Sequence, residues 1–201
     1  MKRILAVSAS VLFHPMLMPL YGIFLIFHSG THISFIPLEY RRMIYTIFFA
    51  SSCALPLTIL VLLRQLNLIR SFRLESSRER ILPVFFTGLF YFIGYMILKK
   101  LNLPGFIYQF ILGSLIAIYL SLVITFWWKI SLHMIGIGGI TGAIIALSLK
   151  MGLGISAALI GLIFISGFLG ASRLYLNAHN PLQVFAGFFI GLITVFTIPF
   201  L

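Results

Sequence analysis

Long apolar runs dominate the chain, and short polar breaks separate them. A helix needs about 20 mostly apolar residues to cross ~30 Å of hydrocarbon. The breaks between the runs carry cations, among them Arg41-Arg42, Lys99-Lys100 and Lys150. The pattern therefore predicts an all-α polytopic membrane bundle of about six to seven transmembrane helices. The expected spans are about 4–27, 43–63, 82–98, 105–128, 131–149, 151–172 and 181–201.

The first of these runs has an ambiguous pattern. Its Met-Lys-Arg start and apolar stretch are similar to a signal peptide, but the stretch is too long and no small-residue cleavage site precedes a polar domain. We expect residues 4–27 to form the first span. The alternative is a re-entrant piece, because His14, Pro15 and Pro19 interrupt the run.

Small residues recur at a four-residue spacing in two of the predicted spans. Gly138 and Gly142 form one such pair, and Gly187 and Gly191 form the other. Glycines at this spacing let two helix backbones approach closely in lipid. The pairs predict a tight contact between helices.

Composition supports the membrane assignment and removes one class of function. Of the residues, 61% are hydrophobic and only 8% are charged, and the formal net charge is +11. Ordinary globular domains carry roughly a quarter charged residues. A soluble nucleic-acid binder has the same sign of charge but needs far more polar surface. We expect an integral membrane protein of one domain, residues 1–201, with the bilayer and no nucleic acid as partner.

The scarcity of carboxylates and cysteines limits the chemistry. The chain has no aspartate, and its only glutamates are Glu39, Glu75 and Glu79. Paired-carboxylate hydrolysis and carboxylate-held magnesium sites are nearly unavailable to it. Its single cysteine, Cys53, allows neither an intramolecular disulfide nor a cysteine zinc site. The histidines are the main candidates for acid–base or nucleophilic work.

Three polar segments fall on the same predicted side of the membrane, at residues 73–83, 129–133 and 172–183. Pairs of spans separate them, so each segment returns to that side. Together they bring His133, His179, several cations and helix N-termini to one membrane interface, where helix dipoles favour an anion. His14 has no comparable polar neighbours in the sequence.

Ordinary structural roles also fit parts of these segments. Ser131 is a natural helix N-cap, and Asn180 with Gln183 fits a capping box. His133 lies about one turn inside an apolar helix, where polar groups are costly and usually functional.

These segments together resemble the signature of the phosphatidic acid phosphatase type 2 / haloperoxidase family. In the third motif, Ser172-Arg173, five residues and then His179 reproduce the family spacing, with Gln183 where the family has aspartate. The second motif matches at Ser131 and His133. The first has Arg73 and Arg80 at the family spacing, with Pro83 two residues late. The resemblance covers residues 73–192, the expected phosphatase-like core.

The resemblance implies the family's helical membrane fold and a lipid phosphatase activity without metal or cofactor. His179 would attack phosphorus and form a phosphohistidine, His133 would protonate the leaving alcohol, and Gln183 would stand at the position that orients His179. The substrate would be a phosphorylated lipid, either a phosphatidate or a polyprenyl phosphate or pyrophosphate. Separately, the polytopic chain of 201 residues is typical of a bacterial inner-membrane protein. The phosphate ligands would be Arg173, Ser131, Arg80, Arg73 and Lys129.

Departures from the motifs leave a second function open. Gln183 is neutral, and its amide can present either a donor or an acceptor to the imidazole. Leu132 replaces a glycine of the second motif. The alternative is therefore a protein that binds an anionic lipid, or scaffolds a membrane complex, without turnover. A transporter is less favoured, because the predicted span centres are almost all apolar.

Overall fold

The computed structural model describes the chain except for residues 73, 75, 102 and 155–156. All of the regular structure in the described part is helical, and six helices are long and apolar enough to cross a membrane. This confirms the prediction of a polytopic helical bundle, and the chain is an integral membrane protein. The six are Leu38–Gln65, Ser77–Lys99, Gly105–Thr125, Leu132–Lys150, Ala157–Tyr175 and Pro181–Phe200.

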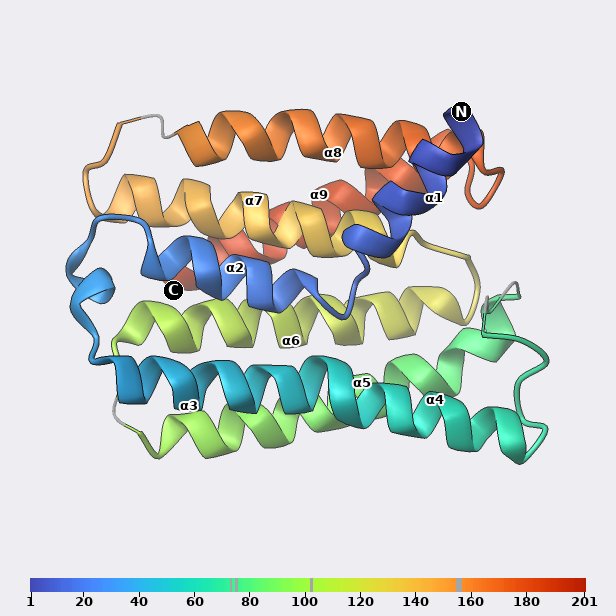
Figure 1. The fold of residues 1–201 in the computed structure, drawn as a ribbon, viewed down its shortest axis with the longest axis horizontal. Coiled ribbons are helices and arrows are strands. Elements are labelled where there is room, and N and C mark those ends of the chain that lie inside the picture. The colour runs from blue at the N-terminus through green and yellow to red at the C-terminus, as the bar shows by residue number, and fades with distance from the viewer. Residues whose placement is uncertain (73, 75, 102, 155–156) are drawn as a thin grey trace.

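The first apolar run is broken, so the prediction of one continuous span over 4–27 is wrong. Helix α1 (Lys2–Leu12) ends at a turn, and α2 (Met18–Phe27) begins after it. Pro15 has no N–H to continue the first helix, whereas Pro19 lies in the first turn of α2, where that N–H is not needed. The two helices still run from one end of the bundle to the other (Figure 1).

The next span has an irregular turn at its centre. Helix α3 (Leu38–Phe49) continues through a π-helical segment, η2 (Ala50–Ala54), into α4 (Leu55–Gln65). The Cys53 thiol in this segment donates a 2.9 Å hydrogen bond to the carbonyl of Met16. The irregular turn is thereby fastened to the break in the first apolar run.

The remaining helices alternate in direction. They are α5 (Ser77–Lys99), α6 (Gly105–Thr125), α7 (Leu132–Lys150), α8 (Ala157–Tyr175) and α9 (Pro181–Thr197). Consequently the N-terminus, the described residues of the connection 66–76, and the connections 126–131 and 176–180 all lie at one end, the right-hand end of Figure 1. This is the arrangement that the count of seven crossings predicts.

Helix α7 is the central helix, and α9 is fitted against it through glycines. A Cβ at Gly138 or Gly142 would overlap the carbonyl oxygens of Phe188 or Leu192 on α9. A Cβ at Gly191 would overlap the Ile135 carbonyl on α7. The predicted close contact between helices is confirmed, and it joins these two glycine-rich helices to each other.

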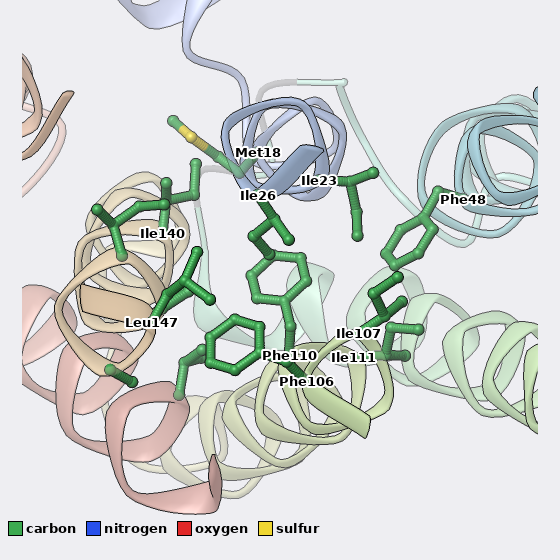
Figure 2. Close-up of a cluster of buried hydrophobic side chains, with 14 of the residues drawn as sticks. Met18, Ile23, Ile26, Phe48, Phe106, Ile107, Phe110, Ile111, Ile140 and Leu147 are labelled. Carbon is green, nitrogen blue, oxygen red and sulfur yellow. The ribbon is translucent and has the colours of Figure 1, made fainter. Parts of the chain in front are cut away.

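Helix α2 anchors the N-terminal region in the core. Its Ile23 and Ile26 are fully buried and lie among side chains of α3, α6 and α7, including Phe48, Phe110 and Ile140 (Figure 2). Helix α1, by contrast, contacts mainly α8. The first apolar run is therefore one buried helix preceded by one peripheral helix.

Candidate functional site

Side chains from five parts of the chain meet at one cavity of about 220 Å³. Its polar end is lined by His14, Arg80, His133, Arg173 and His179. In that order, these residues lie on the break after α1, on α5, on α7, on α8 and on the 176–180 connection. Both predicted histidines thus face the same space, together with two guanidinium groups.

The rest of the cavity extends between the helices and is mostly apolar. Its walls come from α5, α6, α7 and the first apolar run, with isolated hydroxyl groups such as those of Thr87, Tyr91 and Ser114. The sequence pattern does not identify these mid-span hydroxyls as cavity residues, because each lies alone in an apolar run. The cavity therefore joins a cationic, imidazole-rich end to an apolar interior.

The start of α9 fixes the orientation of the His179 ring. Asn180 is the N-cap, and its side chain accepts a hydrogen bond from the Gln183 N–H at 2.9 Å. In return, the Gln183 Oε1 accepts the Asn180 N–H at 3.2 Å, which completes the predicted capping box. The same Oε1 lies 3.0 Å from the His179 Nδ1.

This double contact decides both the amide orientation and the tautomer. A backbone N–H can only donate, so the Gln183 atom that faces it is the oxygen. The His179 Nδ1 must then carry the hydrogen that this oxygen accepts. In the neutral ring, the His179 Nε2 is left with a free lone pair.

Burial and nearby cations keep the His179 ring neutral. His179 is 8% exposed, and burial, together with the charges of Arg80, Arg173 and Lys129, lowers its pKa to about 4, against a smaller raising effect of the Gln183 hydrogen bond. A neutral imidazole is the nucleophilic form. The ring is therefore in that form at pH 7.

His133 and Arg173 both contact Ser10 of α1. The His133 Nε2 lies 3.0 Å from the Ser10 carbonyl oxygen, and since a carbonyl only accepts, this nitrogen carries the hydrogen. The Arg173 Nη1 donates to the Ser10 Oγ at 3.0 Å. The Arg173 Nε is buried without a hydrogen-bond partner in the described structure. One N-terminal residue thus engages two of the predicted site residues.

Arg80 is held by backbone carbonyls of two connections at the same end. Its Nε donates to the Leu74 carbonyl at 2.9 Å, and its Nη1 donates to the Ile130 carbonyl at 3.2 Å. The side chain is only 7% exposed. It therefore places a buried positive charge at the cavity and ties the connections 66–76 and 126–131 together.

Other predicted residues lie differently. Ser131 is the N-cap of α7, but its hydroxyl makes no cap hydrogen bond, and this buried oxygen has no partner in the described structure and does not line the cavity. Lys129 lies close enough to His179 for its charge to lower the pKa of that ring. Arg73 lies outside the described residues, as does Glu75. The Glu79 carboxylate accepts the Arg70 N–H, whereas the acceptor at the His179 Nδ1 is Gln183.

Sequence reasoning missed Ser10 and His14. The His14 ring meets the His133 ring edge-on, with centroids 5.6 Å apart at 79°, although His14 has no comparable polar neighbours in the sequence. The available signal was the interruption by Pro15 and Pro19, which marks the break that turns His14 toward the cavity.

The described residues contain no group of three His, Cys, Asp or Glu side chains that would suit a metal ion. Comparisons of the chain with models of known protein families, with curated proteins and with solved structures found no match.

Proposed function

We propose that this protein is a metal-independent membrane phosphatase or phosphotransferase that acts on a phosphorylated lipid through a phosphohistidine. The observation that carries the proposal is the cavity shared by His133, His179, Arg80 and Arg173, together with the free Nε2 lone pair that Gln183 enforces on His179. The motif resemblance to the phosphatidic acid phosphatase type 2 / haloperoxidase family assigns the same roles.

The proposed reaction has two displacement steps. First, the His179 Nε2 attacks phosphorus and the bond from phosphorus to the lipid oxygen breaks. The His133 Nε2 gives its hydrogen to that oxygen, while the His133 Nδ1 takes the proton of the phosphate monoanion. Water then attacks the phosphohistidine, neutral His133 accepts its proton, and phosphate leaves with the His179 Nε2 restored. Arg80 and Arg173 neutralise charge on the equatorial oxygens, which is the main requirement of phosphoryl transfer.

The shape of the cavity supports a lipid substrate. A headgroup phosphate fits the cationic end at the bundle's end, while an apolar chain fits the walls supplied by α5, α6 and α7. A phosphatidate or a polyprenyl phosphate or pyrophosphate has this form. We place the protein in a bacterial inner membrane.

The decisive experiment measures phosphate release by the purified protein in phosphatidylcholine nanodiscs, with phosphatidate or polyprenyl phosphate and an excess of chelator. We expect release from the native chain, and a loss of roughly 10⁴-fold or more in His179→Ala, because the nucleophile is gone. His28→Ala is the matched control, because this exposed imidazole lies at the C-terminal end of α2 and does not line the cavity. It is hydrogen-bonded to the Phe24 carbonyl. Release that survives His179→Ala would falsify the mechanism.

A second candidate is binding of an anionic lipid without turnover. The neutral Gln183 favours it, because an amide stabilises an imidazolium less than a carboxylate does. On this hypothesis the native chain retains a lipid phosphate in the cavity but releases no phosphate, and Gln183→Asp creates turnover. Turnover by the native chain rules this candidate out.

A further inference from the structure

We infer that helix α1 is a lid over the proposed phosphate site, and that Ser10 occupies the place of the substrate's phosphate ester. This inference rests on the proposed function, since it assigns His133 and Arg173 to the substrate. Ser10 is 123 residues from His133 and 163 residues from Arg173 in the chain, yet it bonds to both. No feature of the motifs requires an N-terminal residue there.

The two contacts of Ser10 are the two that a phosphate ester needs. The proposed general acid directs its Nε2 hydrogen at the Ser10 carbonyl oxygen, 3.0 Å away, so that hydrogen is not available to a leaving oxygen. The Arg173 Nη1 directs its hydrogen at the Ser10 Oγ, where a non-bridging phosphate oxygen would accept. The unpartnered Arg173 Nε adds the second donor that a bidentate phosphate contact uses.

Helix α1 is built to leave this position at low cost. Its buried residues are small: Ala6, Ala9 and Ser10. Its large apolar side chains, such as Ile4 and Val11, are exposed. In lipid, apolar surface gains little by moving from bilayer to helix. Separation of α1 therefore mainly costs the contacts of three small residues and the two Ser10 hydrogen bonds, which a bound phosphate would replace.

The first part of the break, residues 13–15, supplies the hinge. On its far side α2 is fixed, because Met18 is buried in the core and the Cys53 thiol binds the Met16 carbonyl. On its near side α1 contacts mainly α8. A movement about this turn frees His133 and Arg173 while the core helices stay in place.

The first test measures how fast cysteines on α1 react with N-ethylmaleimide in nanodiscs, with and without hexadecylphosphonate, a non-hydrolysable lipid phosphate analogue. Ala9→Cys reports opening, because Ala9 is 4% exposed. Ser8→Cys, on the exposed side of the same helix, is the matched control, and the native chain accounts for Cys53. We expect the phosphonate to speed labelling of Ala9→Cys about tenfold, the scale of one or two exchanged hydrogen bonds, and to leave Ser8→Cys unchanged. An unchanged or slower Ala9→Cys rate overturns the lid, provided that nanodiscs with the protein retain more phosphonate than nanodiscs without it.

The second test separates a lid from a fixed support for His133. Ala6→Leu wedges a larger side chain under α1 one turn away from Ser10, and Ser8→Leu adds the same bulk on the outside. If α1 is a lid, Ala6→Leu lowers KM for the lipid phosphate several-fold with kcat retained, because the closed state is weakened. If Ser10 is a fixed support, Ala6→Leu lowers kcat, and the inference is wrong.

If Ala6→Leu does not fold, the labelling result alone decides whether α1 is a lid. Failure of the lid and failure of the proposed function give different results. Hydrolysis of lipid phosphate with unchanged Ala9→Cys labelling removes only the lid. Phosphonate-dependent opening without phosphate release removes only the catalytic proposal and keeps α1 as a gate over an anion site.

Discussion

At the scale of single residues, Gln183 performs two tasks with one oxygen atom. Its Oε1 closes the capping box with the Asn180 N–H and accepts the hydrogen of the His179 Nδ1. Helix formation and orientation of the proposed nucleophile therefore depend on the same contact. This explains how a neutral side chain fixes the tautomer that a carboxylate would otherwise enforce.

Gln183→Glu is the most informative change at this scale. The carboxylate has the same length and accepts the same two hydrogens, and its charge favours the imidazolium. The pKa of His179 is about 4 in the native chain, so protonation removes the nucleophile only as the pH falls toward 4. We expect Gln183→Glu to raise that pKa toward 6.5 and to move the acid limb of kcat/KM to higher pH.

The measurements are pH profiles of kcat/KM and the ¹⁵N chemical shifts of the His179 ring. Asn180→Ala is the matched control, because it removes the other half of the capping box and costs about 1 kcal/mol of helix stability. It leaves the acceptor of the Nδ1 hydrogen in place, so we expect no shift of the acid limb. Equal acid limbs in the native chain and in Gln183→Glu contradict the assignment of His179 as nucleophile.

At the scale of elements, the contact between α7 and α9 sets the distance between the two histidines. His133 lies in the first turn of α7, and His179 immediately precedes the N-cap of α9. A Cβ at Gly187, in the second turn of α9, would lie 2.7 Å from the Ser131 carbonyl, so the two backbones are already close at the start of α7. The glycines therefore set the positions of the two histidines as well as the distance between the two backbones.

Gly191→Ala tests this role. Its Cβ would overlap the Ile135 carbonyl and lie 2.9 Å from the Gly139 nitrogen, both of which are backbone atoms that cannot rotate away. We expect a loss of about 1–3 kcal/mol of stability, the usual cost of overpacking, and a fall in phosphate release. Gly161→Ala on α8 is the control, because a Cβ there meets nothing within 4 Å. Thermal unfolding in detergent and phosphate release are measured for both variants. Unchanged stability and unchanged phosphate release in Gly191→Ala would contradict the close contact between α7 and α9.

At the scale of the whole molecule, the bundle places a charged site at one end and an apolar cavity beneath it. The cationic end collects side chains from the N-terminal break, α5, α7, α8 and the connection to α9, whereas the walls belong to the helix interiors. On the proposed function, a lipid phosphate would span both parts, and a water-soluble phosphate would use only the first.

Filling the apolar part predicts a loss that depends on the lipid chain. Ser114→Trp on α6 places a large ring in the cavity, away from the histidines. We expect KM for a long-chain lipid phosphate to rise about tenfold, with little change for p-nitrophenyl phosphate. Val123→Trp, on the exposed side of α6, is the control. Steady-state kinetics with both substrates measure the effect. An equal rise in KM for both would show that the lipid chain does not occupy this part of the cavity.

The fold could be predicted from sequence further than the site could. The seven apolar runs and their polar breaks predicted the helices, apart from the break between α1 and α2. Close helix packing at Gly138, Gly142, Gly187 and Gly191 was also predicted, because small residues at helical spacing are typical of helix contacts in lipid. That the two pairs meet each other came from the structure. The orientation of Gln183 was not readable, since an amide offers a donor and an acceptor with nearly equal shape.

The sequence by itself determined a membrane bundle with His133, His179 and their cations at one end. Span length and the alternation of crossings follow from local hydrophobicity and the thickness of the bilayer. Only the tertiary structure decided that the first apolar run breaks after α1, that Ser10 bonds to His133 and Arg173, and that His14 joins the cavity. Such contacts join residues more than a hundred positions apart, so they depend on how complete helices fit together and leave no periodic trace in the chain.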